Sequence, residues 1–530
     1  MTLSTELSQS NIYREVNMLF NSYIFVFLFF PICLLGYYGL LHLQKMKMAK
    51  LFLIAMSFWF YGYFNVSYLL IMICSIAGNY LFHRMLSHRQ SKTLMVAAVV
   101  ANLGLLFYFK YFDFFLSTIN AVFGTSAMLR DILLPLGISF FTFQQISFVA
   151  DTYLGEVKEC PFVDYTLFVA FFPQLIAGPI VNHGEMLPQF RNLGRKPAQW
   201  DRIAEGCGLF ILGLAKKVLL ADTFGAGVDF GYGNLAALGR TDAVIVILSY
   251  TLQLYFDFSG YCDMARGIGK MLGIEIPINF NSPYKAVNIV DFWKRWHITL
   301  NRFFTKYVYI PLGGNRRGPA RMYLNLMIVF LLSGIWHGAG WNYLAWGALH
   351  GVLYVITRFW QRHLQKCGGQ KDGAQKETSV GKVTQTSQIV AVKAKKTFMT
   401  FVSRILLFLY VSVAWVYFRA ESIAQANRLL LTAVKGPAQK ISMELAECFQ
   451  MDEFWYILKV LHLDNMSYSR YILMWLLLAA GIYLAMIGRN AAQRMERVHY
   501  RVGSMMVFTV LAVWCVLTFS KVSTFLYFNF

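Results

Sequence analysis

The sequence predicts an all-α, polytopic integral membrane protein of about 11–13 transmembrane helices, with re-entrant or broken helices among them. Apolar residues make up 57% of its 530 residues and charged residues 14%, whereas soluble globular chains are about 45–50% apolar and about 25% charged. The apolar residues occur in long unbroken runs, which argues against an outer-membrane barrel with its alternating pattern. The composition also excludes a disordered chain and a soluble multidomain enzyme.

Apolar runs separated by polar loops mark the candidate spans. They cover residues 18–42, 50–64, 66–82, 94–117, 132–150, 162–180, 204–221, 243–262, 322–337, 341–358, 401–418, 471–488 and 503–521. The first run is too long for the apolar region of a signal peptide and has no small-residue cleavage site after it. We therefore expect it to be the first span rather than a cleaved leader.

The formal net charge of +21 is expected to reflect basic cytoplasmic loops, because multi-span proteins collect Lys and Arg on that side. This interpretation predicts a lipid bilayer around the chain and no nucleic-acid partner. Loops and spans divide the sequence into four regions. They are a polar N-terminal segment, 1–17; a core of spans, 18–357; a basic, hydrophilic cytoplasmic insert that we expect to be a mobile linker, 358–400; and C-terminal transmembrane helices, 401–530.

Helix-breaking residues interrupt two of the candidate spans. Pro135 and Gly137 stand in segment 132–150, and Pro173 and Gly178 stand in segment 162–180. Breaks at membrane depth are tolerated where protein or a water-filled cavity satisfies the freed backbone groups. We therefore expect broken or re-entrant helices that line a site here, although a simple kink is an equal alternative.

Residues 250–347 carry more polar and ionisable groups than lipid-facing helices do. Asp257, Ser259, Asp263 and Arg266 stand within one apolar run. Such groups usually face the protein interior or a cavity. A structural ion pair between Asp263 and Arg266, three residues apart, is the alternative to a functional role.

The pattern of residues 291–306 predicts an amphipathic helix at the cytoplasmic interface. Its basic stripe consists of Lys294, Arg295, Arg302 and Lys306. The stripe suits anionic lipid headgroups or an anionic donor such as coenzyme A, and the pattern does not separate the two. His297 lies one turn from Trp293 and from Asn301, in line for a hydrogen-bonded position.

His337 is a candidate catalytic base at the end of a strongly apolar span. Its neighbours Gly338, Gly340 and Trp341 leave room and an aromatic wall, and His350 follows 13 residues later. Imidazole is the natural general base for deprotonating a hydroxyl near neutral pH. A buried histidine with an ordinary packing role is the alternative.

Several well-known motifs are absent from the sequence. It has no GxxxxGK[ST] loop, no HExxH, no GxSxG and no CxxC pair. We therefore expect no ATP-driven pumping, no metal ligands and no bound cofactor. No nucleophile stands out, which favours direct transfer with a histidine base.

Five segments together resemble the membrane-bound O-acyltransferase (MBOAT) family, and within it the alginate O-acetyltransferase branch. They are LPLGISFFTFQQISFVADTY (134–153), FFPQLIAGPI (171–180), LYFDFSGYCDMARGIGKMLGIEIPINFNSPY (254–284), DFWKRWHITLNRFFTKYVYIPLGGNRRG (291–318) and LLSGIWHGAGWNYLAWGALHG (331–351). The resemblance implies an MBOAT fold, with helices around a central funnel, and makes 18–357 the catalytic core. It implies that His337, in WHG, and His297, in RWH, are the catalytic residues.

The resemblance also implies the reaction and its setting. An acetyl group from acetyl-CoA or another acyl thioester would cross the membrane for O-acetylation of an extracellular polysaccharide, with help from an extracellular or periplasmic acetyltransferase partner. The expected location is a bacterial cytoplasmic (inner) membrane. Candidate substrate-binding residues are Trp336, Trp341, Asp257, Ser259, Asn281, Trp296 and Arg295.

Two other functions stay open from the sequence. A D-alanyl transferase for teichoic acids, using a carrier-protein thioester, belongs to a neighbouring branch of the same family. A multi-span transporter or flippase also has broken helices and buried charges, although no internal repeat is visible in this sequence.

Overall fold

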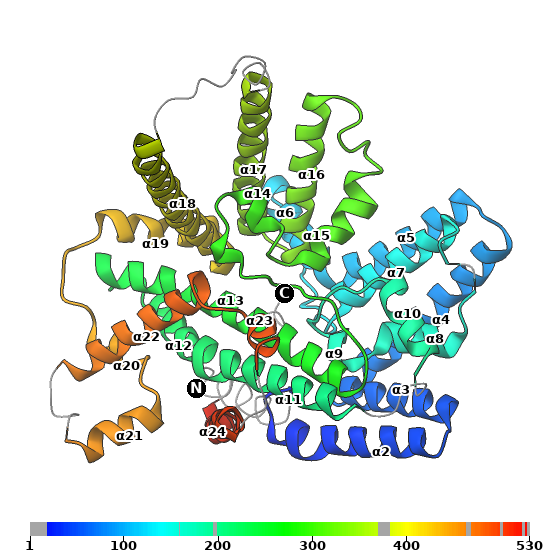
Figure 1. The fold of residues 1–530 in the computed structure, drawn as a ribbon. Helices are drawn as coiled ribbons and strands as arrows, with labels where there is room; N and C mark the ends of the chain where they lie inside the picture. Colours follow the sequence, from blue (N-terminus) through cyan, green and yellow to red (C-terminus); the bar gives the residue numbers. More distant parts are fainter. Residues whose placement is uncertain are drawn as a thin grey trace.

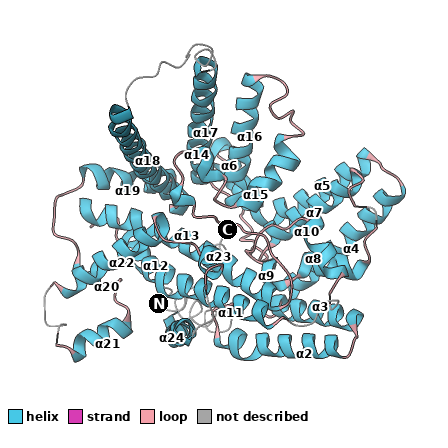
Figure 2. Ribbon diagram, viewed as in Figure 1, coloured by secondary structure: helices cyan, strands magenta, loops and turns pink. Residues whose placement is uncertain are grey.

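A computed structural model describes residues 18–157, 159–193, 199–368, 382–462, 468–498, 502–521 and 525–526. These residues form helices and connecting loops, and none of them belongs to a β-strand (Figure 2). The predicted all-α class is therefore confirmed. The polar segment 1–17 lies outside the described residues.

The helices follow the chain in an order that Figure 1 shows. The first group is α2 (Phe30–His42), α3 (Met46–Gly62), α4 (Val66–His88), α5 (Lys92–Leu106), α6 (Phe112–Phe123), α7 (Ile138–Tyr153), α8 (Phe162–Ala170), α9 (Phe172–Leu175), α10 (His183–Arg191), α11 (Trp200–Ala215) and α12 (Asp222–Gly233). The second group is α13 (Arg240–Met271), α14 (Ile289–Trp293), α15 (Ile298–Phe304), α16 (Pro319–His337), α17 (Trp341–Gly368), α18 (Lys382–Arg419), α19 (Ile423–Lys435), α20 (Met443–Glu447), α21 (Asp452–Val460), α22 (Ser469–Met486), α23 (Ala491–Met495) and α24 (Val502–Leu517). Four π-helical turns, η1 (Phe25–Phe29), η2 (Phe107–Tyr111), η3 (Lys216–Ala221) and η5 (Thr305–Tyr309), extend or join these helices.

Seven helical stretches of the described chain are long and apolar enough to cross a membrane. They are Phe25–His42, Val66–His88, Lys92–Phe123, Arg240–Met271, Pro319–His337, Thr397–Arg419 and Ser469–Met486. Other candidate spans correspond to shorter helices, such as α3, α7 and α24. The chain thus combines full spans with shorter helical pieces, as expected for a polytopic fold with broken segments.

The helices are interrupted in both segments, 132–150 and 162–180, where glycine and proline predicted a break. Gly137 adopts a left-handed backbone conformation, with φ +71°, directly before α7 begins. The segment 162–180 is divided into α8 and α9, and Phe171 separates them with an extended ψ of 107°. Pro173 lies in the first turn of α9, where its missing N–H costs no helical hydrogen bond.

Helix α13 crosses the centre of the molecule and nearly all of its apolar span is buried within the protein (Figure 1). It packs on α11, α12, α18 and α19. Glycines let α11 and α13 approach closely: a Cβ on Gly213 would lie 2.6 Å from the Gly260 carbonyl oxygen, and one on Gly206 would lie 2.7 Å from that of Gly267. Close contact of small residues is a common way for membrane helices to associate.

Two lysines neutralise the carboxylates in the middle of α13. Lys217 Nζ lies 2.9 Å from Asp257 and 2.6 Å from Asp222. Lys216 Nζ lies 2.6 Å from Asp263, whereas the predicted Asp263–Arg266 pair is longer, at 3.9 Å. Buried charges at membrane depth are costly unless they pair, and η3 places both lysines beside α13.

The prediction of a continuous amphipathic helix over 291–306 is wrong. The chain forms α14, bends at His297, and then continues as α15 and η5. The bend is held from outside the segment, because Ile298 donates its N–H to the Asn279 carbonyl. Asn301 closes the inside of the bend with hydrogen bonds from Nδ2 to the carbonyls of Trp293 (2.6 Å) and Trp296 (2.8 Å).

The insert predicted at 358–400 is helical where the structure describes it. Helix α17 continues to Gly368, and α18 starts at Lys382. Both helices therefore extend into the region that was expected to be a mobile linker. Residues 369–381 lie outside the described part of the chain.

Candidate active site

His337 lies at the C-terminal end of α16, where the helix meets α17. Its side chain is buried, with 2% of the residue exposed. The two helices pack without space for larger residues, because a Cβ on Gly334 would lie 2.4 Å from the Tyr343 carbonyl oxygen. A Cβ on Gly338 would lie 2.1 Å from the Tyr343 ring, so this glycine allows the chain to turn immediately after His337.

His297 stands at the bend between α14 and α15 in a left-handed backbone conformation, with φ +46°. This conformation is strained for a residue other than glycine, and such strain is concentrated at functional sites. Asn279 holds the ring: its Oδ1 lies 3.2 Å from His297 Nδ1 and also accepts the Thr299 N–H at 3.1 Å. Because the Thr299 N–H requires an oxygen there, Nδ1 donates, and the neutral ring keeps its lone pair on Nε2.

The two predicted histidines come together in the interior. Their ring centroids are 6.2 Å apart, and both residues are fully or almost fully buried. Aromatic rings surround them: Trp336, Trp346 and Phe418 contact His337, and Phe258 contacts His297. The two imidazoles therefore lie together in a buried, largely apolar cluster of aromatic rings, which we call the chamber.

His350 forms a third imidazole near this chamber and was not among the predicted site residues. It is fully buried against Trp346 and Trp293, with ring centroids 5.0 Å and 5.1 Å away. Both of its ring nitrogens, and Nε1 of both tryptophans, lack a hydrogen-bond partner within the described residues. Buried polar atoms are nearly always satisfied, so this wall offers hydrogen bonds to a molecule that enters.

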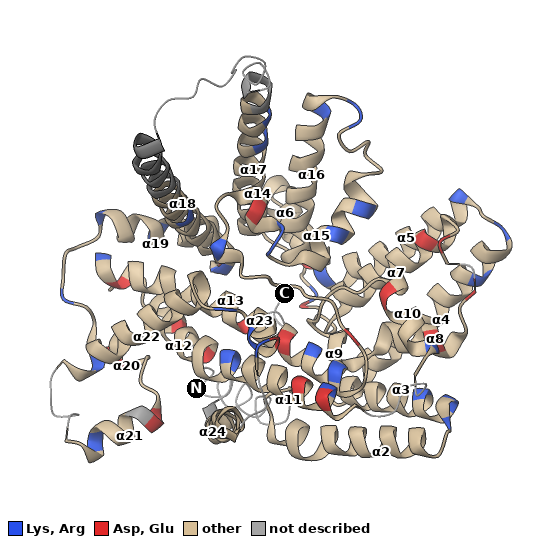
Figure 3. Ribbon diagram, viewed as in Figure 1, with Lys and Arg blue, Asp and Glu red and all other residues tan. Residues whose placement is uncertain are grey.

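A cavity of ≈ 1050 Å³ is lined by residues of α14–α17 and the loop before α10. Ile298, the residue after His297, belongs to its lining, whereas His297 and His337 do not. Its basic lining residues are Lys294, Arg302, Lys306, Arg358 and Arg362, and Figure 3 shows Lys and Arg along α15, α16 and α17. Asn315 of the turn before α16 also lines it. Aromatic contacts lead from the cavity wall to the chamber, because Trp293 packs on Trp346 and Trp346 packs on His337.

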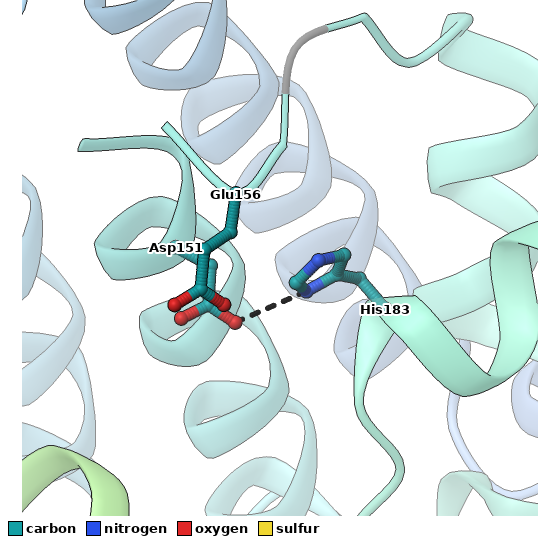
Figure 4. Close-up of side chains that lie close together, drawn as sticks. All are labelled: Asp151, Glu156 and His183. Atoms are coloured by element: carbon teal, nitrogen blue, oxygen red, sulfur yellow. Dashed lines mark ion pairs between the residues drawn. The ribbon is translucent and has the colours of Figure 1, made fainter. Parts of the chain in front are cut away.

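One group near the cavity-lining residue Lys306 has the spacing of metal ligands. Asp151, Glu156 and His183 point toward one another in Figure 4, with ligand atoms within 4.8 Å. However, Lys306 Nζ already lies 2.8 Å from Asp151 Oδ1 and 2.6 Å from Glu156 Oε2. Tyr307 Oη donates to Asp151 Oδ2 at 2.7 Å, and His183 Nδ1 lies 3.1 Å from the same oxygen. The group is therefore an ion-pair network that ties η5 to α7.

The predicted substrate-binding residues are distributed over three places. Trp336 lies in the chamber, between His337 and the Phe140 and Phe143 rings of α7. Trp296 is buried against Phe280, with ring centroids 5.0 Å apart, and against Trp415, at 4.9 Å. Trp341 lies at the start of α17 with 57% of it exposed, and its ring contacts Phe114.

The polar members of the predicted set bond to other parts of the protein. Asp257 pairs with Lys217, and Ser259 accepts a hydrogen bond from Lys216 Nζ at 3.3 Å. Asn281 donates its N–H to the Arg295 carbonyl at 2.9 Å. The Arg295 guanidinium pairs with Asp291 at 2.8 Å. Of the nine predicted residues, the structure brings His337, His297 and Trp336 into direct ring contact.

Comparisons with known proteins identify the family of this chain. The MBOAT, membrane-bound O-acyltransferase family, model matches residues 155–383, which include both histidines. The peptidoglycan O-acetyltransferase of Helicobacter pylori is 39% identical over 450 residues, or 79% of this chain and 80% of that protein. The chain belongs to the membrane-bound O-acyltransferase family. It is a multi-pass membrane protein and an acyltransferase, which decides against a transporter or flippase.

The chain is also similar to two other kinds of acyl-transferring protein. The probable alginate O-acetylase AlgI of Pseudomonas aeruginosa is 36% identical, and the match covers 78% of this chain and 74% of that protein. The teichoic acid D-alanyltransferase of Bacillus subtilis is 28% identical over 44% of this chain and 60% of that protein. The O-acetylating relatives thus match more of the chain and at higher identity than the D-alanylating one.

Proposed function

We propose that this acyltransferase moves acetyl groups from a cytoplasmic thioester to the O-acetylation of an extracytoplasmic polysaccharide, with His337 as the general base. The observation that carries the proposal is a pair of buried histidines, 6.2 Å apart. A basic cavity, whose lining includes Ile298, the residue after His297, supports it. The named relatives support the class of substrate, because they are a peptidoglycan O-acetyltransferase and probable alginate O-acetylases.

The chemistry is a direct transfer. The acceptor hydroxyl gives its proton to His337, and its oxygen attacks the thioester carbonyl carbon. The new C–O bond forms as the C–S bond breaks, and the leaving thiolate takes the proton back from the imidazolium. His297 Nε2, as an acceptor, stabilises the positive charge that develops on His337 during this step.

The cavity is suited to the donor. Coenzyme A carries phosphates, and Lys294, Arg358 and Arg362 line the cavity without a carboxylate partner in the parts of the chain that the structure describes. Arginine and lysine bind phosphate through charge-assisted hydrogen bonds. Asn315 lines the cavity, and Arg316 and Arg317 follow it in the chain. Because basic residues are enriched in cytoplasmic loops, we propose that this part of the cavity faces the inside of the cell.

The acceptor hydroxyl reaches the site from the extracytoplasmic side, opposite the donor. Transfer therefore also moves the acetyl group across the membrane. We place the protein in a bacterial cytoplasmic membrane, with a periplasmic or surface acetyltransferase as the partner that delivers the group to the polymer. Acetyl-CoA is the donor that best matches the closer relatives. A D-alanyl group on a carrier protein is the alternative that the more distant relatives support.

The test uses membrane vesicles that contain wild-type protein or His337→Ala. Each is supplied with acetyl-CoA labelled in the acetyl group, and in parallel with a carrier protein loaded with labelled D-alanine. Acetyl label on a sugar polymer or a partner protein with the wild type alone is the expected result. Label from D-alanine alone would favour the other branch, and equal acetyl transfer by His337→Ala would exclude the assigned base.

A further inference from the structure

The end of helix α16 has three backbone carbonyls that need partners outside the helix. The last four carbonyls of a helix have no intrahelical donor, and inside a membrane no bulk water replaces it. Lys110 Nζ donates to the Trp336 carbonyl at 2.5 Å and to the His337 carbonyl at 3.3 Å. Tyr111 Oη donates to the Ile335 carbonyl at 2.9 Å.

A π-helical turn delivers both side chains. Lys110 and Tyr111 are the last two residues of η2, which joins α5 to α6 within one long span, Lys92–Phe123. The wider turn interrupts the regular α-helical spacing, and such turns occur frequently at functional sites. Two consecutive residues thereby reach three consecutive carbonyls of a helix more than 200 positions away in the sequence.

Lys110 has no ion-pair partner among the described residues. Its other contacts are the Ser139 hydroxyl at 3.4 Å and the faces of the Tyr111 and Trp336 rings. The interior lysines Lys216 and Lys217, by contrast, pair with aspartates. An ammonium group in a membrane span is costly and usually functional, and the contacts of this one converge on the end of α16.

The same contacts also restrain Trp336, the residue before His337. Trp336 is held between the Phe140 and Phe143 rings of α7 on one side and the Lys110 ammonium, 5.8 Å from its ring centre, on the other. A cation at a helix C-terminus also interacts favourably with the helix dipole. The last turn of α16 is thus restrained in position and in direction.

We propose that Lys110, assisted by Tyr111, is a positioning residue that fixes the His337 end of α16 for acyl transfer. This inference rests on the proposed role of His337 as the base. Lys110 acts through backbone carbonyls and does not itself exchange a proton with the substrate. Misplacement of a catalytic group by about 1 Å costs about a hundredfold in rate, so loss of this restraint should affect turnover rather than donor binding.

The experiment compares full-length Lys110→Met, Lys110→Arg and Tyr111→Phe with the wild type and His337→Ala, all in membrane vesicles. Lys50→Met is the matched control, because it removes a half-buried lysine that pairs with Asp164 at 2.6 Å, away from α16. Steady-state acetyl transfer gives kcat and KM for acetyl-CoA. Hydrogen–deuterium exchange of the peptide that covers residues 333–341 measures the order of the helix end without any need for activity.

The proposal predicts that Lys110→Met lowers kcat by about 10–100-fold and changes KM by less than about threefold. Exchange in the 333–341 peptide should rise, while α13 peptides stay unchanged. Lys110→Arg should regain part of kcat, Tyr111→Phe should show a smaller loss, and Lys50→Met should keep the wild-type kcat.

Wild-type kcat and wild-type exchange in Lys110→Met would overturn the inference, as would an equal rise in exchange over the whole protein. If the wild type shows no acetyl transfer, the proposed function fails separately. The exchange measurement then still decides whether Lys110 orders the end of α16.

Discussion

His297 owes its position to Asn279, a residue 18 places earlier in the chain. Asn279 Oδ1 accepts hydrogen bonds from His297 Nδ1, from the Thr299 N–H and from the Thr299 hydroxyl at 2.9 Å. One amide oxygen therefore stabilises the strained bend and also selects the tautomer of the imidazole. The second histidine of the site depends on this single side chain more than on its own helix.

Replacing Asn279 with Ala should reduce acyl transfer by about tenfold or more, since the imidazole loses its orientation. Each buried donor left unsatisfied also costs about 1–3 kcal/mol of stability. Thermal unfolding in detergent and the transfer assay measure the two effects. Asn102→Ala is the control, because it removes a buried amide that bonds to Asn79 (2.6 Å) in the contact between α4 and α5; it should lose stability but keep kcat. A full kcat in Asn279→Ala would show that the orientation of His297 does not matter.

At the residue scale, the sequence predicts the two histidines of the site better than it predicts the residues that hold them in position. His337 and His297 stand in recognisable motifs, and the structure brings them together. The partners of Lys110 and Asn279 are distant in the chain, and local patterns contain no information about such contacts. A lysine within the apolar run 94–117 is a signal that sequence reasoning missed, because intramembrane charges are rare.

Among the helices, α14 to α17 form the lining of the basic cavity. If the cavity holds the donor phosphates, Arg358→Gln should raise KM for acetyl-CoA by about tenfold with little change in kcat, because a hydrogen bond to a charged group is worth about 1.5–3 kcal/mol. The same variant should show a weaker dependence of KM on salt concentration. Arg428→Gln on α19 is the control, since Arg428 is exposed and lies outside the cavity lining. An unchanged KM in Arg358→Gln would place the donor elsewhere.

The contact between α11 and α13 depends on glycine. Gly213→Ala should destabilise the protein by about 1–3 kcal/mol, because its Cβ would overlap the backbone of Gly260. Gly39→Ala is a matched change in a helix with nothing within 4 Å, so it should be neutral or slightly stabilising. Thermal unfolding of the two variants measures the difference. Equal unfolding temperatures would mean that the helices have room to separate.

The elements show why some breaks are predictable and others are not. Proline and glycine carry their own backbone preferences, so the interruptions before α7 and around α9 are visible in the sequence. Residues 291–306 contain neither residue, and their amphipathic pattern suits a helix. Hydrogen bonds that the Ile298 and Thr299 N–H groups donate to Asn279 override that local preference, which is a tertiary effect.

The distribution of basic residues along the chain predicts the orientation of the protein in the membrane. The positive-inside rule predicts that Arg316 and Arg317, beside the cavity, face the cytoplasm. A cysteine introduced as Arg317→Cys should therefore react with a membrane-impermeant maleimide in inside-out vesicles and not in intact cells. The parent protein, which has eight cysteines, measures the background. Labelling in intact cells would show that Arg317 faces the outside. It would contradict the predicted orientation and the proposed side of donor entry.

Composition and long apolar runs are sufficient to predict a helical membrane protein, because a run of about 20 apolar residues is typical of a membrane-spanning helix. It does not reveal which helices face lipid and which are central. Helix α13 has a hydropathy similar to that of α16, yet far more of it is buried within the protein. Only its glycine contacts and its lysine-paired aspartates distinguish it, and both depend on the position of α11 and η3.

A structure of the full-length protein in a lipid nanodisc, bound to a non-transferable thioether analogue of acetyl-CoA, tests the central claim most directly. The account predicts phosphates at Lys294, Arg358 and Arg362, and the acetyl group in the chamber between His297 and His337. An analogue bound with its acetyl group outside that chamber, or on the opposite face of the membrane, would contradict it.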